Sequence, residues 1–144
     1  MSDGWFFMAD TFEIEIVTPE KMVVRDVAEE AQIPAKNGYL GVLPGHAPLI
    51  TELSIGEITY RSAGTITHIS VAWGFAEVLP NKVTILAESA ERAEDIDVQR
   101  AEEAKKRAEE RLKEGGSGLD YPRCLHALKR AESRLQVASA AVNR

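Results

Sequence analysis

The spacing of apolar residues in this 144-residue chain changes near residue 90. Before that point apolar and polar residues alternate in short runs, as they do from Phe12 to Ile16. After it, apolar residues recur three and four positions apart. A period of two is typical of half-buried strands, and a period between three and four is typical of amphipathic helices. The sequence therefore predicts an all-β region that is followed by an α-helical one.

The first region contains about eight short apolar runs, and residues that favour turns separate them. The clearest runs are Phe12–Ile16, Val27–Ile33, Leu49–Leu53, Ile58–Tyr60, Ile69–Val71, Phe75–Val78 and Val83–Ile85. No helical pattern lies between these runs, whereas parallel βαβ units would need one. Residues 9–90 are therefore predicted to form an antiparallel β-sandwich or flattened barrel.

Residues 91–144 are predicted to form two helices, with Asp95 or Asp97 capping the first and Asp120 capping the second. The expected apolar stripes are Ala101, Ala104, Ala108 and Leu112 on the first helix, and Leu125, Leu128, Ala131, Leu135, Ala138 and Val142 on the second. The four-residue loop from Gly115 to Gly118 makes the pair an antiparallel hairpin. Because alanine pairs bury little apolar surface, we expect this hairpin to be weakly held and mobile.

Composition excludes several classes of protein. Cys124 is the only cysteine, which rules out a disulfide-rich scaffold and favours a reducing compartment. No apolar run approaches the roughly 18 residues of a membrane span. The formal net charge of −6 argues against a general nucleic-acid binder. Residues 1–8 lack the basic flank of a signal peptide, and because Met8 is a second candidate initiator they are taken as an N-terminal extension.

No catalytic constellation is visible. The histidines, at positions 46, 68 and 126, lack metal-ligand spacing, and His46 fits a structural role in a Pro-Gly-His-Ala-Pro turn. The glycines between Gly38 and Gly45 precede no Gly-Lys-Ser/Thr, so they do not form a phosphate-binding P-loop. Cys124 lies beside the helical stripe and is interpreted as a small packed residue. The sequence predicts a protein that is not an enzyme.

The C-terminal helix is basic although the chain as a whole is acidic. From residue 123 onward the chain contains one acidic residue, Glu132, and five basic ones, Arg123, Lys129, Arg130, Arg134 and Arg144. In an antiparallel hairpin, Arg100 would approach Arg130 and Arg134, and the three side chains could surround one anion. The alternative is a solvated, salt-bridged helix surface, which composition taken alone favours.

Six motifs follow one another along the chain. They are Thr18-Pro19-Glu20, Gly38–Leu49, Gly74–Val78, Val83–Ala87, Asp95–Ala101 and Ala127–Ala131. In this order and spacing, from Ala9 to Val142, they resemble the epsilon subunit of the bacterial rotary F-type ATP synthase, which is called delta in mitochondria. The resemblance implies an N-terminal β-sandwich and a C-terminal helical hairpin, in agreement with the pattern of apolar residues.

The resemblance also implies a role. It is that of a non-catalytic subunit of the central stalk, peripheral on the cytoplasmic side of the bacterial plasma membrane and attached to it only through the complex. The implied partners are the gamma subunit, the ring of c subunits and the catalytic alpha/beta hexamer. Asn37, Gly38 and Tyr39 match the loop that meets the c ring. An extended hairpin would inhibit ATP hydrolysis, with Arg123, Lys129, Arg130 and Arg134 facing acidic loops of the catalytic subunits.

No cofactor is implied as a requirement, but ATP is implied as a regulatory ligand. In several bacterial members the folded hairpin binds ATP through an Ile/Leu-Asp-x-x-Arg-Ala motif, which Ile96, Asp97, Arg100 and Ala101 complete here. Glu91, Arg130 and Arg134 match the remaining positions of that site. The carboxylates would bind the adenine amine or the ribose, and the arginines would bind the phosphates.

Two alternatives stay open. One is a stalk subunit in which the motif binds no nucleotide, and the other is a free nucleotide-sensing adaptor unrelated to any motor. The sequence also departs from the family at two positions. Trp73 stands where small residues are usual, and Tyr39 stands where a glutamate is common in the loop that meets the c ring.

Overall fold

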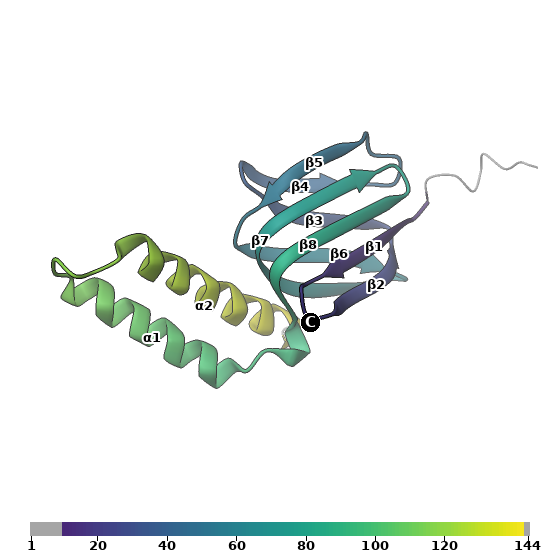
Figure 1. The fold of residues 1–144 in the computed structure, drawn as a ribbon. Helices are drawn as coiled ribbons and strands as arrows, with labels where there is room; N and C mark the ends of the chain where they lie inside the picture. Colours follow the sequence, from purple (N-terminus) through teal and green to yellow (C-terminus); the bar gives the residue numbers. More distant parts are fainter. Residues whose placement is uncertain (1–9, 143–144) are drawn as a thin grey trace, which may run out of the picture.

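The computed structural model describes residues 10–142, so the predicted extension at residues 1–8 lies outside its described part (Figure 1). The strands are β1 (Phe12–Val17), β2 (Met22–Ala28), β3 (Glu30–Ala35), β4 (Gly38–Val42), β5 (Leu49–Leu53), β6 (Gly56–Ser62), β7 (Thr65–Leu79) and β8 (Lys82–Arg92). The 3₁₀ helix η2 (Ala93–Asp95) and the helices α1 (Val98–Glu114) and α2 (Tyr121–Val142) follow. The predicted fold, a sandwich followed by a helical hairpin, is confirmed.

The strands form a sheet that folds back on itself. They pair in the order β2-β1-β8-β7-β5-β3-β4, and β6 pairs with β3 and β7. Since β5 and β6 lie one after the other along the same edge of β7, and both also pair with β3, the sheet closes into a flattened sandwich. The pairing of β1 with β8 is parallel, where an antiparallel sandwich was predicted. These two strands are far apart in the chain, so no hairpin connection dictates their direction.

The strand β7 joins two apolar runs that the sequence suggested were separate strands. Gly74 lies between them with a φ of +122°, and a Cβ placed there would lie 1.9 Å from the carbonyl oxygen of Leu86. Trp73, directly before it, also has a positive φ of 59°. The ladder with β8 resumes in the same register beyond this irregularity, with Gly74 opposite Ala87. The glycine therefore lets β7 continue instead of ending in a turn.

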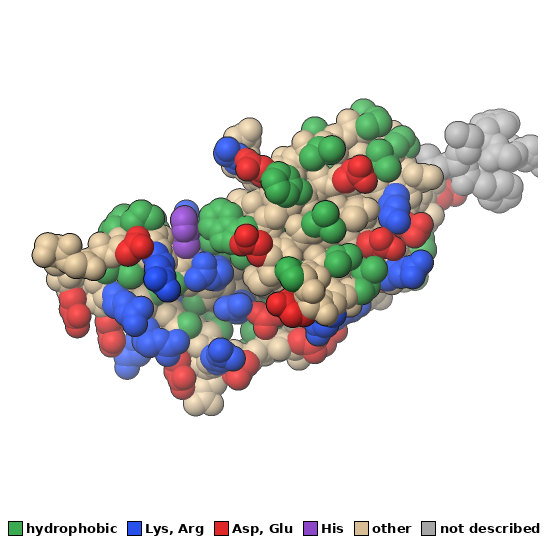
Figure 2. All heavy atoms as spheres, viewed as in Figure 1, with side chains coloured by type: hydrophobic (Ala, Val, Ile, Leu, Met, Phe, Trp, Pro, Cys, Tyr) green, Lys and Arg blue, Asp and Glu red, His purple; other side chains and the backbone are tan. Residues whose placement is uncertain are grey.

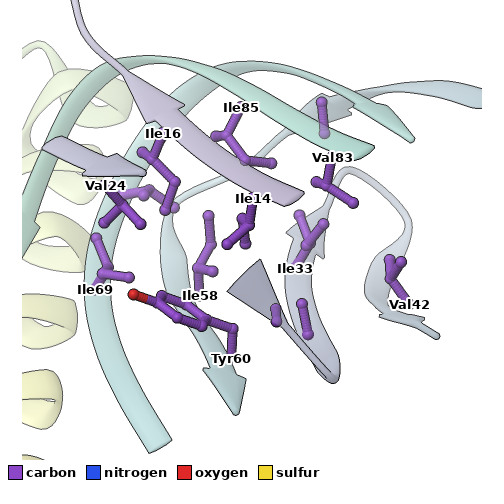
Figure 3. Close-up of a cluster of buried hydrophobic side chains, with 14 of the residues drawn as sticks. Ile14, Ile16, Val24, Ile33, Val42, Ile58, Tyr60, Ile69, Val83 and Ile85 are labelled. Atoms are coloured by element: carbon purple, nitrogen blue, oxygen red, sulfur yellow. The ribbon is translucent and has the colours of Figure 1, made fainter. Parts of the chain in front are cut away.

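The core lies between the two layers of the sandwich (Figure 3). Its largest fully buried side chains are Ile14, Ile16, Val24, Ile33, Val42, Ile58, Tyr60, Ile69, Val71, Val78, Val83 and Ile85. The Tyr60 hydroxyl donates a hydrogen bond to Asp26 Oδ2 over 2.9 Å, so its polar group is satisfied inside the core. Burial raises the pKa of Tyr60 above its usual value of 10.0, and the nearby Asp26 carboxylate adds to that rise.

The hairpin lies against the sandwich through α2, with α1 on the outside (Figure 1). Ala101 and Ala108 of the predicted α1 stripe are buried, and so are Cys124 and Ala131 on α2. The stripe predicted for α2 is only partly right, because its leucines are half-buried whereas Ser133 and Val137 are buried. This difference arises because α2 has two covered faces, one toward α1 and one toward β6 and β7. The side chain of Val142 lies outside the described residues.

Candidate functional site

A cavity of about 490 Å³ lies where the hairpin meets the sandwich. Its walls come from the turn between β1 and β2, from β8, from the first turns of α1 and from α2. The lining residues are Thr18, Glu20, Lys21, Ser89, Ala90, Glu91, Asp97, Arg100, Ala101, Ala104, Arg107 and Arg134. This volume lies within the usual range for small-molecule sites, about 300–1,000 Å³.

Five of the seven residues predicted to bind a nucleotide line this cavity. They are Glu91, Asp97, Arg100, Ala101 and Arg134. Arg130 lines a small crevice next to it, together with Glu91 and Arg134. Ile96 does not line the cavity, because its side chain is only 8% exposed and packs with Ala93 and Val137. The structure thus assigns Ile96 to the packing between η2 and α2.

Asp97 begins α1. Its Oδ1 accepts a hydrogen bond from the backbone N–H of Arg100 over 3.1 Å, which is the usual contact of an N-cap residue. This confirms Asp97 rather than Asp95 as the cap. The cap fixes the carboxylate at the cavity wall, while the exposed Arg100 side chain starts from the same turn. A hydrogen-bond acceptor and a cation are thereby placed side by side.

An ion pair joins α2 to β8 across the cavity. Arg134 Nε lies 2.5 Å from Glu91 Oε1, and each side chain is about one-third exposed, at 33% and 34%. Arg134 keeps further guanidinium donors for a ligand, because one contact uses only its Nε. The pair therefore holds Arg134 at the cavity wall without exhausting its hydrogen-bonding capacity.

The turn between β1 and β2 supplies the opposite wall. Thr18 is buried, and its Oγ1 accepts a hydrogen bond from the Lys21 N–H over 3.3 Å. This bond tightens the turn and places Glu20 and Lys21 at the cavity. Neither of them, nor Arg107, was predicted from the sequence as a site residue. Only the folded arrangement brings residues 18–21 beside α1.

A second set of contacts holds α2 on the sandwich. Ser133 Oγ donates to the carbonyl oxygen of Gly56 over 3.0 Å and lies 3.0 Å from Ser70 Oγ. At the other end of the contact, the rings of Trp73 and His126 meet edge to face with centroids 4.9 Å apart. Ser133 and Trp73 gave no functional signal in the sequence beyond the unusual position of Trp73. We call the Ser133, Ser70 and Gly56 contact the serine latch.

The loop predicted to meet the c ring lies at the turn between β3 and β4. Asn37, Gly38 and Tyr39 are exposed there, and the Tyr39 side chain is 59% exposed. The Tyr39 hydroxyl nevertheless accepts a hydrogen bond from the backbone N–H of Glu57 over 3.1 Å. Tyr39 is thus held against β6 while most of its ring remains available to another surface.

The basic side chains predicted to contact catalytic subunits lie on two faces of α2. Arg123 and Lys129 are exposed, while Arg130 and Arg134 are half-buried. Arg123, Arg130 and Arg134 line cavities beside α1, whereas Lys129 lines none of those described. Figure 2 shows Lys and Arg side chains gathered over the hairpin on the face in view.

The described residues offer no metal site. Among residues 10–142, no group of three or more potential ligands is arranged to hold a metal ion. In the same part of the chain, neither helix has the combination of length and hydropathy needed to cross a bilayer.

Comparisons with known proteins identify the relatives of this chain. Residues 11–93 match the family model of the ATP synthase delta/epsilon chain β-sandwich domain, and residues 94–139 match that of its long α-helix domain. The chain is 73% identical over 109 residues to the ATP synthase epsilon chain of Koribacter versatilis, covering 76% of this chain and 77% of the relative. It is 43% identical to that of Geobacter sulfurreducens over 95% of this chain and 100% of the relative.

A solved structure agrees with the fold. A chain of the Euglena gracilis mitochondrial ATP synthase superposes with a TM-score of 0.76 at 19% identity, covering 99% of this chain and 86% of that one. At this identity the likeness supports the shared architecture of sandwich and hairpin.

Proposed function

Because the chain belongs to the ATP synthase delta/epsilon family, whose epsilon chains are non-catalytic subunits of the central stalk, we propose that its hairpin is an ATP-sensitive brake on ATP hydrolysis. In this proposal the hairpin lies on the sandwich when ATP is bound. It extends toward the catalytic subunits when ATP is lost. The observation that carries the proposal is the cavity between hairpin and sandwich, lined by the carboxylate of Asp97 and by Arg100 and Arg134.

The chemistry of the cavity suits a nucleotide. The carboxylates of Glu91 and Asp97 accept hydrogen bonds from the adenine amine or the ribose hydroxyls. The arginines provide planar, forked donors that fit phosphate oxygens, with Arg100 on α1 and Arg130 and Arg134 on α2. Ala101 is a small residue at the wall, which leaves room for a ring to approach the helix.

The position of the cavity explains how a ligand would act on the hairpin. Its walls belong to the sandwich and to both helices, so the complete site exists only in the folded arrangement. A ligand that binds this arrangement alone stabilises it by RT ln(1 + [L]/Kd). High ATP would therefore keep the hairpin on the sandwich, and low ATP would release it.

The released hairpin is proposed to be the inhibitory form. Arg123, Lys129, Arg130 and Arg134 would then face acidic loops of the catalytic subunits, where complementary charge favours contact. The apolar cluster that joins the hairpin to η2 is small, so a modest free energy suffices to shift the population between the two arrangements.

The sandwich is proposed to connect the gamma subunit with the c ring at the membrane, on the cytoplasmic side in bacteria. An apolar row crosses its outer surface, because Leu86 lies beside both Val17 and Phe75 in the sheet register. Phe75 is 54% exposed and Leu86 is 56% exposed, so the row offers the gamma subunit a surface to cover. Asn37, Gly38 and Tyr39 would meet the c ring.

Calorimetric titration of the full chain with ATP tests the proposal, with ADP as the comparison ligand. Arg100→Gln removes an exposed cation from the cavity, and we expect it to weaken ATP binding about tenfold, the effect of losing a charge-assisted hydrogen bond. Asp97→Ser keeps an N-cap but removes the carboxylate, so it tests ligand binding separately from helix capping. Lys113→Gln, an exposed change outside the cavity, is the matched control.

The outcomes separate the alternatives. If the wild-type chain binds no ATP up to several times its cellular concentration, the site is structural and the stalk subunit acts without nucleotide. The inhibitory role is tested in the assembled synthase by removing residues 96–144, which leaves β8 and η2 in place. Inhibition of hydrolysis that persists after this truncation would remove the hairpin as the brake. Failure to co-purify with gamma and c subunits would favour a free adaptor.

A further inference from the structure

A second cavity runs between α1 and α2, with a volume of about 580 Å³. It shares the lining residues Ala104, Arg107 and Arg134 with the cavity at the sandwich, so the two cavities adjoin each other along the hairpin. We call the part between the helices the arginine groove. Its arginines are Arg107, Arg111, Arg123, Arg130 and Arg134. Small side chains between them, such as Ala108 and Ala127, leave the space open.

Most of these cations form no ion pair in the part of the chain that the structure describes. Among residues 10–142, Arg134 pairs with Glu91, but no carboxylate lies within ion-pair distance of the other four arginines. Among the described residues, Asp120 is the only acidic one that lines the groove, and its Oδ1 already accepts a hydrogen bond from the Arg123 N–H at the start of α2. Arg107 and Arg111 lie four residues apart on one helix face, where like charges destabilise a helix.

The two adjoining cavities contain more arginines than the proposed ATP site uses. The proposed ATP site uses Arg100, Arg130 and Arg134, and Arg107 lines the same cavity, which leaves Arg111 and Arg123 beyond it. Arg100 and Arg111 are separated by 11 positions on α1, or about 16 Å at the helical rise of 1.5 Å per residue. An anion that engaged all of these arginines would have to follow the groove along α1. A row of forked donors at such spacing fits repeated phosphate groups.

We propose that the arginine groove binds condensed phosphate chains longer than a triphosphate. Such a chain occurs as free inorganic polyphosphate and as the bridge of a dinucleoside polyphosphate. The proposal extends the ATP site proposed above but does not depend on it, because Arg111 and Arg123 lie outside the cavity of that site. A bound chain would contact both helices, so it would hold the hairpin closed and occupy the basic side chains that face acidic partners in the extended form.

Titration calorimetry on the full chain tests this inference, with long-chain inorganic polyphosphate, diadenosine pentaphosphate and inorganic tripolyphosphate as probes. We expect at least one of the two long probes to bind about tenfold more tightly than tripolyphosphate, since it reaches further arginines. The double variant Arg111→Gln/Arg123→Gln should remove that advantage. Both side chains are exposed, and circular dichroism verifies that the helices are retained.

A matched control separates a built groove from general attraction of a polyanion to basic residues. Lys106→Gln/Lys113→Gln removes the same charge from exposed positions that line neither cavity, and it should change the affinity for the long probes less than about twofold. Equal losses from the two double variants would overturn the inference. It would also be overturned if neither long probe bound more tightly than tripolyphosphate.

The same variants distinguish a failure of the polyphosphate proposal from a failure of the ATP proposal. Asp97→Ser should weaken ATP binding but leave inorganic polyphosphate binding unchanged, whereas Arg111→Gln/Arg123→Gln should have the opposite pattern. If ATP does not bind while polyphosphate binds through Arg111 and Arg123, the ATP site fails and the groove stands. If the affinity for diadenosine pentaphosphate falls both in Asp97→Ser and in Arg111→Gln/Arg123→Gln, a dinucleoside polyphosphate is the ligand that fits both cavities.

Discussion

The sandwich and the hairpin are held by different amounts of buried surface. The sandwich core contains branched aliphatic side chains that are completely buried, such as Ile14, Ile58 and Ile85. The cluster that joins the hairpin to the end of β8 consists of Ala93, Ile96 and Val137, with Ala138 and Ala141 packed against it. Since burial of a large aliphatic side chain contributes roughly 1.5–3 kcal/mol, the sandwich is much the more stable region.

This difference indicates which region moves. In the proposed function the sandwich connects the gamma subunit with the c ring, so it has to stay folded, and its core provides that stability. The hairpin adds a few polar contacts to a small apolar cluster, so in the proposed function it is the region that leaves the sandwich, which stays folded. Substitutions in the two regions should therefore change different quantities, namely the global free energy of unfolding and the local free energy of hairpin release.

The largest effect is expected in the sandwich, at Gly74. An alanine Cβ would lie 1.9 Å from the Leu86 carbonyl oxygen, and the φ of +122° is unfavourable for alanine as well. Gly74→Ala should therefore lower the free energy of unfolding by more than about 3 kcal/mol, as measured by urea denaturation. Gly64→Ala is the control, since Gly64 also has a positive φ, of +81°, but no atom lies within 4 Å of the added Cβ.

Gly64→Ala is expected to cost about 1–2 kcal/mol, the strain of the backbone alone. Similar losses in the two glycine variants would mean that β7 can shift away from Leu86. The sandwich would then be able to adapt around an added side chain, which contradicts the view that it is the more rigid of the two regions.

A smaller and local effect is expected at the serine latch. Ser133→Ala removes the hydrogen bonds to Gly56 and Ser70 and leaves their polar groups without this partner. Hairpin release should become easier by about 1–3 kcal/mol, while the unfolding of the sandwich changes little. Amide hydrogen exchange resolved along α2 and β1 measures both quantities. Ser117→Ala, in the exposed loop between the helices, should change neither by more than about 0.5 kcal/mol.

A Ser133→Ala variant that lowers protection equally in α2 and β1 would contradict the separation of the two regions. The hairpin and the sandwich would then open as one cooperative unit. A movable hairpin would in that case require a partner protein to detach it.

The architecture could be predicted from the sequence because its signals are local. The alternation around Ile14 and the alanine spacing on α1 follow directly from strand and helix periodicity, and Asp97 is a typical N-cap. The parallel pairing of β1 with β8 could not be predicted, because it joins strands that are distant in the chain. Nor could the continuity of β7 through Trp73 and Gly74, since a glycine after a short apolar run usually indicates a turn.

The candidate site was partly predictable for the same reason. Its motif residues are close in sequence, and an antiparallel hairpin brings Arg134 toward them. Lys21 and Arg107 were missed, because only the packing of the hairpin on the sandwich places them at the cavity. Ile96 belongs to the motif but packs against Val137. The motif therefore contains one residue that packs η2 on α2, whereas Asp97, Arg100 and Ala101 line the cavity.

The smallest effect is expected for the ion pair of Glu91 and Arg134, which also joins the hairpin to the sandwich. Because each side chain is about one-third exposed, water and salt screen the pair. A double-mutant cycle with Glu91→Gln and Arg134→Gln, read by hydrogen exchange of α2 without ligand, should give a coupling of about 0.2–1 kcal/mol. Raising the salt concentration should reduce it further. If this coupling energy exceeds the free-energy change of hairpin release in Ser133→Ala, the ion pair contributes more to holding the hairpin than the serine latch does. Charge, rather than buried polar contact, would then hold the hairpin, and the entry of an anionic ligand beside Arg134 would weaken that hold before any ligand contact replaced it.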